Sequence, residues 1–189
     1  MILLFSECVV SCIPLVAPSD EALSKGMNHP MEISQPVRVK RTYLQTLIAP
    51  PEIVFPLLCP VREVEWANGW NPRLVVTGSG FVEPGCVFIV PDKPQESTWV
   101  VTQWDPQAYF VEFIKVIPEF TVGKIEIQLR KGDSAQTLAE VTYSFTALSR
   151  QGAEFVEQFT SERYEEFMKE WESELNHFLQ TGTKQENGM

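Results

Sequence analysis

Histidine and cysteine are scarce in this 189-residue sequence, which has two of the former and four of the latter. The cysteines form no Cys-x-x-Cys pair, and neither His29 nor His177 stands at a spacing suited to zinc. We therefore expect no metal site and no cofactor, and we expect free thiols of the kind found in a reducing compartment. No Ser-His-Asp set for nucleophilic catalysis stands out either.

Positive charge is also in short supply, with 15 Lys and Arg against 25 Asp and Glu and a formal net charge of −10. Nucleic-acid binding depends on cationic contacts to phosphate, and anionic membrane surfaces attract basic segments. The composition therefore disfavours both partners and favours solubility. The length and the 44% hydrophobic content suit one globular domain with a buried core.

A strongly apolar stretch lies at residues 1–17. It is too short and too interrupted for a membrane span, so we expect no stable membrane insertion. No Lys or Arg precedes it, Glu7 interrupts it, and Pro18 follows its end, all of which are unusual for a secretory signal. We expect a dispensable leader on a cytoplasmic protein, with a secretory leader at residues 1–17 as the alternative.

Three segments follow from this interpretation. Residues 1–32 are the apolar leader and a linker outside the fold, residues 33–182 are the folded domain, and residues 183–189 are a frayed tail.

The middle of the chain is predicted to form about seven strands, because apolar and polar residues alternate with period two between turn signals. Short turns between neighbours favour antiparallel pairing. A change of parity at Gly123 suggests a β-bulge that bends the sheet. The strands are predicted near residues 36–47, 74–77, 86–90, 98–104, 109–117, 120–129 and 139–146.

Helices are predicted on both sides of these strands. A short segment begins at Pro51 and is limited by Pro56, and a long helix covers residues 160–180, with Gly152 as its earliest start. An apolar row spaced by four winds around the long helix, as suits a helix crossing a twisted, concave sheet. A bend between Phe159 and Thr160 would be a simpler cause of the first part of this drift. The row comprises Phe155, Phe159, Phe167, Trp171, Leu175 and Leu179.

The order of strand, short helical pair, six strands and long helix resembles the START-related helix-grip superfamily over about residues 37–182. The most specific part is the run Ile53-Val54-Phe55-Pro56-Leu57-Leu58-Cys59-Pro60-Val61-Arg62-Glu63 with Trp66 and Trp70. The closing pattern Trp171-x-x-x-Leu175-Asn176-His177-x-Leu179-x-Thr181-Gly182 supports it. The chain looks like an uncharacterised branch of this superfamily.

The resemblance implies an α+β helix-grip fold, in which a curved antiparallel sheet of about seven strands wraps around the C-terminal helix and leaves a cavity. Members bind lipids, sterols, polyketides or other apolar molecules, and a few catalyse cyclisation or dehydration. No catalytic motif of the superfamily can be matched residue by residue, so no catalytic residue is assigned. We expect a small hydrophobic or amphipathic ligand in the cavity; the sequence does not indicate an oligomeric state.

Aromatic side chains are the predicted lining of this cavity, since apolar walls with few polar groups are typical of small-molecule sites. Core packing is the alternative for each one. Arg163 stands in the helical apolar row and could bind a ligand carboxylate or phosphate; alternatively it reaches solvent or pairs with Glu166. The predicted ligand-binding residues are Arg163, Phe159, Phe167, Tyr143, Phe145, Trp66, Trp70, Trp99, Tyr109 and Phe113.

Two other functions use the same fold. A cyclase or dehydratase would need a proton-moving group in the cavity, for which Glu63, Glu65 and Glu112 are candidates if buried, and Cys59 is expected to be an inert thiol. A protein-interaction module of the co-chaperone type would instead have a filled core and an exposed apolar patch. A buried carboxyl or tyrosine with a perturbed pKa facing the cavity would favour the enzyme.

Overall fold

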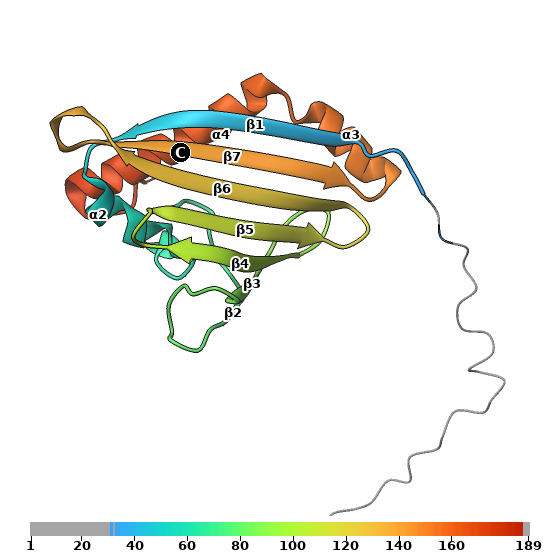
Figure 1. The fold of residues 1–189 in the computed structure, drawn as a ribbon, viewed down its shortest axis with the longest axis horizontal. Helices are drawn as coiled ribbons and strands as arrows, with labels where there is room; N and C mark the ends of the chain where they lie inside the picture. The colour runs from blue at the N-terminus through green and yellow to red at the C-terminus, as the bar shows by residue number, and fades with distance from the viewer. Residues whose placement is uncertain (1–30, 32, 187–189) are drawn as a thin grey trace, which may run out of the picture. The chain divides into compact units, whose positions relative to one another are not determined.

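Within the residues described by the computed structural model, 31 and 33–186, seven strands form one antiparallel sheet (Figure 1). Most of the predicted leader at 1–32 lies outside these residues, and the compact unit begins at Pro36. The strand order is β1-β7-β6-β5-β4-β3-β2, so the first and last strands of the chain are neighbours. The strands are β1 (Arg38–Leu47), β2 (Leu74–Val76), β3 (Val87–Val90), β4 (Ser97–Asp105), β5 (Phe110–Ile117), β6 (Thr121–Lys131) and β7 (Thr137–Ala147).

A short helical pair separates β1 from β2. Helix α2 (Pro51–Val54) starts with a proline in its first turn, and the 3-10 helix η1 (Phe55–Leu58) takes over where Pro56 cannot supply the N–H of a continuing α-helix. A second 3-10 turn, η2 (Glu63–Glu65), follows, and a third, η3 (Asp133–Ala135), joins β6 to β7. The prolines therefore limit the segment as the sequence predicted.

The C-terminal helix is broken at the position that the sequence offered as the alternative explanation for the drift of the apolar row. Helix α3 (Arg150–Gln158) ends before Phe159, whose ψ of 65° is not helical, and α4 (Ser161–Thr181) starts afresh. The Thr160 hydroxyl caps α4 by accepting a hydrogen bond from the Arg163 N–H at 3.3 Å. Gly182 ends α4 in the left-handed conformation, with a φ of 71°.

Helix α4 runs behind the sheet along β1 and β7 (Figure 1). Its buried side chains Tyr164, Met168 and Leu175 join the core. The Asn176 amide holds the edge of β1: its Oδ1 accepts a hydrogen bond from the Ile48 N–H at 2.9 Å, and its Nδ2 donates to the Thr46 carbonyl at 3.0 Å. The helix thus covers part of an edge strand whose backbone would otherwise be open to pairing. The predicted α+β helix-grip architecture is confirmed.

Residues after α4 turn back toward η2 and the segment that follows it. The Asn68 Nδ2 donates to the Gln185 carbonyl at 3.2 Å, and the Lys184 ammonium donates to the Val64 carbonyl at 3.5 Å. The tail predicted to fray at 183–189 therefore makes contacts as far as Gln185, while 187–189 lie outside the described residues.

The bulge expected at Gly123 is absent from β6, and that prediction is wrong. The pairing of β6 with both neighbours is regular through Gly123, and the shift of register lies in β4 instead, between Val101 and Gln103. Thr121 and Gly123 are buried on the same face as Ile125. The sequence suggested a change of face because Gly123, which lies on the buried face, has no apolar side chain to continue the alternation.

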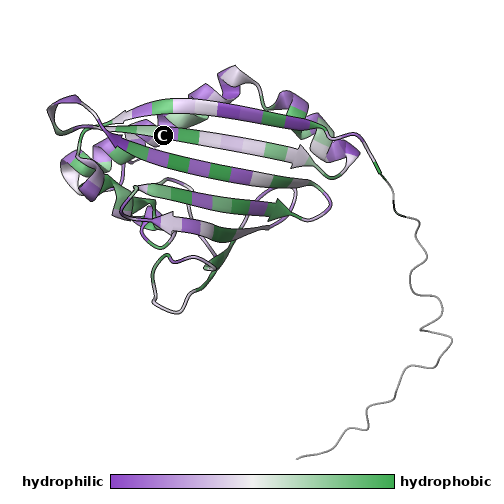
Figure 2. Cartoon of the chain, in the orientation of Figure 1, coloured by the Kyte–Doolittle hydropathy of each residue, from purple (hydrophilic) through white to green (hydrophobic). Residues whose placement is uncertain are grey.

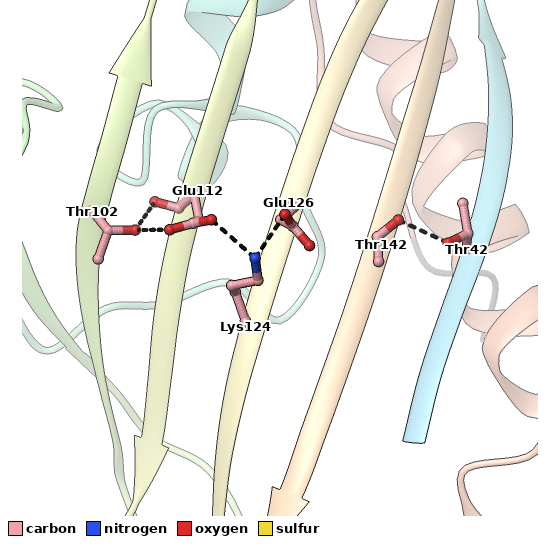
Figure 3. Close-up of polar contacts among 6 residues, drawn as sticks. All are labelled: Thr42, Thr102, Glu112, Lys124, Glu126 and Thr142. Carbon is pink, nitrogen blue, oxygen red and sulfur yellow. Dashed lines mark hydrogen bonds and ion pairs between the residues drawn. The ribbon is translucent and has the colours of Figure 1, made fainter. Parts of the chain in front are cut away.

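The outward face of the sheet is polar, and the alternation is visible along the strands in Figure 2. Lys124 on β6 bridges two acids, with its Nζ 2.8 Å from Glu126 Oε1 and 3.2 Å from Glu112 Oε2 (Figure 3). The Thr42 and Thr142 hydroxyls share a hydrogen bond of 2.8 Å on the same face. These polar groups satisfy one another on the outward face. The apolar side chains, which alternate with them along the strands, face the helices.

Candidate cavity site

A cavity of about 390 Å³ lies between the inner face of the sheet and the C-terminal helices. Strands β3 to β7, helices α3 and α4, and the segment from η2 to Trp70 all contribute to its wall. The lining residues are Glu63, Ala67, Asn68, Gly69, Trp70, Phe88, Val90, Pro91, Asp92, Trp99, Phe113, Lys115, Ile125, Ile127, Tyr143, Phe145, Phe155, Phe159, Phe167 and Trp171.

Half of these lining residues are aromatic, and their rings pack in two groups. On β3, β4 and the loop before β2, Trp70, Phe88 and Trp99 pack with ring centroids 5.5 to 5.9 Å apart. At the helix break, Phe155 and Phe159 both meet Phe145 of β7 edge-on, with ring centroids 5.3 and 5.1 Å from it. Each group holds its rings by mutual contact, so the wall is formed before any molecule enters.

Part of the wall reaches solvent. The Phe167 side chain on α4 is 45% exposed although it lines the cavity, and its ring stands edge-on to Tyr143 at 6.1 Å. The Lys115 ammonium lies 2.5 Å from Asp92 Oδ2 and 5.2 Å from the centre of the Trp99 ring. The one basic side chain of the lining is therefore neutralised by its neighbour and stacked on a wall residue.

Glu63 is the unusual polar group of the site. The 3-10 turn η2 places it in the wall with 8% of its surface exposed, and no described residue donates a side-chain hydrogen bond or an ion pair to its carboxyl. Burial raises the pKa of Glu63 to about 8, because the charged form loses its hydration and gains no partner. At neutral pH the carboxyl is mainly protonated and can donate a hydrogen bond.

Tyr143 is the second ionisable group of the inner wall. Its pKa is raised, first by burial and then by the nearby Glu63 carboxyl. Its phenol therefore stays protonated across the physiological range and acts as a hydrogen-bond donor. Tyr164, whose ring centroid lies 5.7 Å from that of Tyr143, differs because its hydroxyl already donates to the Val141 carbonyl at 2.7 Å.

Seven of the ten predicted ligand-binding residues line the cavity. Trp70, Trp99 and Phe113 stand in one part of the wall, and four more residues stand toward the C-terminal helices: Tyr143, Phe145, Phe159 and Phe167. A role in ligand binding stays a prediction for each of them.

Two predicted aromatic residues lie elsewhere. Trp66 is fully buried behind the wall, where its indole N–H donates to the Leu57 carbonyl at 3.0 Å and its ring lies 5.0 Å from that of Trp171. Tyr109 stands at the turn between β4 and β5, with its ring 5.9 Å from that of Phe55. Both side chains support the structure around the cavity without reaching its surface.

Arg163 also lies outside the lining, as in the alternative that the sequence left open, in which its side chain reaches solvent. Its side chain is exposed, and its guanidinium donates to the Gln158 carbonyl at 3.3 Å. Arg163 precedes the buried Tyr164 by one position, as the half-exposed Phe167 precedes the buried Met168, so both stand at the margin of the buried row. Phe167 keeps its ring on the cavity wall, whereas the Arg163 guanidinium turns to the Gln158 carbonyl at the helix break.

Several lining residues were not among the predicted site residues. Phe88 lies in a predicted strand whose alternation places it inward, and Phe155 and Trp171 belong to the predicted apolar row of the helix, so periodicity could have found them. Glu63 was only one of three candidate acids. The other two are engaged on the surface, Glu65 with Arg62 at 2.9 Å and Glu112 with Lys124.

The buried thiols and the loop after β2 have ordinary structural roles. Cys59 and Cys86 are buried free thiols. The loop at Gly78-Ser79-Gly80 surrounds an internal anion, because the Gly78 N–H and the Thr77 hydroxyl donate to the Glu83 carboxylate and lower its pKa. Among residues 33–186, no group of three or more potential ligands is placed to bind a metal. In the same part of the chain, no helix combines the length and apolarity needed to cross a membrane.

No protein-family model matches this chain, and no curated protein matches it. Its structure is similar to norcoclaurine synthase from Thalictrum flavum, with a TM-score of 0.58 at 9% identity over 93% of this chain and 99% of that one. A structure of that synthase in complex with dopamine and hydroxybenzaldehyde gives 0.54 at 10% identity over 73% and 86%. Ara h 8.0201 gives 0.51 at 15% identity over 73% and 97%. These likenesses show a shared fold, in agreement with the helix-grip architecture that the sequence predicted.

Proposed function

We propose that this protein binds a small hydrophobic molecule with aromatic rings in the cavity between the sheet and the C-terminal helices. The observation that carries the proposal is the cavity itself, about 390 Å³ with aromatic side chains as half of its lining residues. A volume of this size is typical of small-molecule sites, and a preformed apolar wall lowers the ordering cost of binding. The helix-grip fold of the neighbours is compatible with this use.

Affinity would come mainly from removing apolar surface from water, at about 25 cal/mol per Å². The aromatic groups around Trp99 and Phe145 offer flat faces and edges to a ring. Phe167, exposed at one side of the wall, would close over a bound molecule. Glu63 and Tyr143 would orient it as hydrogen-bond donors.

Titration with 2-(1-naphthyl)ethanol, followed by calorimetry, tests this proposal. We expect one saturable site per chain, weakened by Phe167→Ala, because the ring offers on the order of 50 Å² to a ligand and its loss costs about 1 kcal/mol, or roughly fivefold in Kd. Phe81→Ala is the matched control, since Phe81 is a phenylalanine 60% exposed in the β2–β3 loop and outside the lining. No saturable binding, or equal effects of the two substitutions, would refute the proposal.

An enzyme of the cyclase or dehydratase type is the second candidate, favoured by the buried Glu63 carboxyl beside Tyr143. A carboxyl with a pKa near the working pH can give and take a proton. The test compares the small molecules that co-purify with the wild type and with Glu63→Gln. Different molecules, substrate with the variant and product with the wild type, would support the enzyme; the same molecule in both would support a carrier.

The interaction-module alternative has less support, because it calls for a filled core. Exposed apolar side chains do occur around β2, where Leu74, Val76 and Phe81 are all about half exposed or more. They surround a strand of three residues and leave the cavity unexplained.

A further inference from the structure

The charged side chains that line the cavity indicate which charge a ligand would carry. Among the described lining residues, the acids are Glu63 and Asp92 and the one base is Lys115. Asp92 and Lys115 neutralise each other at 2.5 Å. Glu63 alone can present an uncompensated charge, and that charge is negative.

Among the lining residues that the structure describes, an anionic ligand would find no free cation. Lys115 is already paired, and Arg163 lies outside the lining with its guanidinium bonded to Gln158. A cation, by contrast, would meet the Glu63 carboxyl together with aromatic faces, which attract cations through their quadrupoles. The wall already shows this second interaction, because the Lys115 ammonium lies 5.2 Å from the centre of the Trp99 ring.

We propose that the cavity selects an organic amine in its cationic form, with the ionised Glu63 carboxylate as the counter-charge and the aromatic wall around the apolar body. This inference rests on the proposed function, since it names the ligand class of the same site. Tyr143, close to Glu63, would donate a hydrogen bond to the carboxylate once it has ionised. The ammonium group supplies the partner that the buried carboxyl lacks in the free protein.

Binding would then release a proton. Because burial raises the pKa of Glu63 to about 8, roughly nine-tenths of the free protein carries this proton at pH 7. The ammonium group displaces it, since a buried ion pair needs the charged form of both partners. Tyr143 stays protonated because its pKa is raised, and the Asp92 and Lys115 side chains pair with each other in the lining. On the same segment, Arg62 and Glu65 pair with each other.

The experiment uses three probes that share one ring system: 2-(1-naphthyl)ethylamine, 2-(1-naphthyl)ethanol and 1-naphthylacetate. Calorimetry at pH 7 in two buffers of different ionisation enthalpy measures the protons released by the wild-type full chain. We expect roughly 0.9 proton released with the amine and near zero with the alcohol. The amine's affinity should rise about ninefold from pH 6 to pH 7, as Glu63 loses its proton more easily, while the alcohol's stays flat.

Two substitutions complete the test. Glu63→Gln should remove the preference for the amine and the proton release, so that the amine and the alcohol bind alike. Glu65→Gln, on the same 3-10 turn but paired with Arg62 at the surface, should behave as the wild type. The proton count comes from the wild type alone and does not depend on a variant folding.

The outcomes distinguish a failure of this inference from a failure of the proposed ligand binding on which it rests. If the alcohol or the acetate binds as tightly as the amine at pH 8, or the amine releases no proton, the amine inference is overturned while ligand binding stands. If none of the three probes binds, both proposals are overturned. A tenfold or greater preference for the amine at pH 8, lost in Glu63→Gln, supports both.

Discussion

Replacing Glu63 by Gln should stabilise the protein, by an amount that grows with pH. Glu63 is 8% exposed and its carboxyl has no partner among the described residues, and burial raises its pKa from the ordinary 4.5 to about 8. Since one pKa unit corresponds to 1.36 kcal/mol, ionising the buried group costs about 5 kcal/mol more in the folded than in the unfolded chain. The amide of Gln has nearly the same shape and never ionises.

The direction follows from the raised folded-state pKa. Below about pH 4 the carboxyl is protonated in both states, and the wild type and Glu63→Gln should be equally stable. Between pH 4.5 and 8 the unfolded wild type ionises while the folded one does not, so wild-type stability falls by about 1.4 kcal/mol per pH unit relative to the variant. The advantage of the variant should be about 3 kcal/mol at pH 7 and about 5 kcal/mol at pH 9.

Urea unfolding at several pH values, followed by tryptophan fluorescence, measures this difference. Glu65→Gln is the control, because its carboxyl is exposed and its pKa is lowered by Arg62. The ionised Glu65 carboxylate stabilises the wild type above the unfolded-state pKa, and this stabilisation is lost as the pH falls through the folded-state pKa. The free energy of unfolding of Glu65→Gln relative to the wild type should therefore fall slightly as the pH rises, which is opposite to the trend for Glu63→Gln. Parallel stability curves for the wild type and Glu63→Gln between pH 5 and 9 would refute the burial of an unpaired carboxyl.

Three further substitutions test how the fold supports the cavity. Gly152→Ala should destabilise by at least about 2 kcal/mol in urea unfolding, with Gln151→Ala as a neutral control, because a Cβ would lie 2.0 Å from the Phe120 carbonyl oxygen. Gly123→Ala would place a Cβ 2.7 Å from the Phe145 ring; the resulting loss of about 1–2 kcal/mol of unfolding free energy should be reduced by adding Phe145→Leu, which removes the clashing ring. Asn176→Ala should cost about 1–2 kcal/mol by freeing the β1 edge, and retention of full stability would contradict that role.

Periodicity in the sequence predicted most of the fold because it depends on local patterns. Strand alternation predicted the β-sheet, and the four-residue spacing predicted the C-terminal helix but left open whether a winding stripe or a bend after Phe159 caused its drift. The pattern gave a wrong prediction, a β-bulge, at Gly123, where there is no side chain to show which face the residue occupies. A glycine on the buried face looks like a change of face, and only the pairing of β6 with its neighbours shows that the alternation continues.

The site was less predictable, because its residues are selected by packing over long sequence distances. Trp66 and Trp70 are four residues apart, yet one fills the core behind the wall and the other forms the wall. Arg163 shared the spacing of the apolar row, but it stands in the first turn of α4, where its guanidinium donates to the Gln158 carbonyl and does not line the cavity. Glu63 stood out only when the 3-10 turn was seen to place it inside, for an acid in a short turn is usually solvated.

The loss of stability that the buried Glu63 carboxyl causes is itself evidence for a functional role of this residue. A buried carboxyl without a partner is worth several kcal/mol of lost stability near neutral pH, a large share of the 5–15 kcal/mol that holds a typical domain together. Positions where a local rule is broken without compensation in the fold are where function is expected. A methionine or glutamine would suit the fold of this segment better. A ligand that brings a positive charge into the cavity would supply the counter-charge that the Glu63 carboxylate lacks. Glu63 would then destabilise the free protein but stabilise the complex.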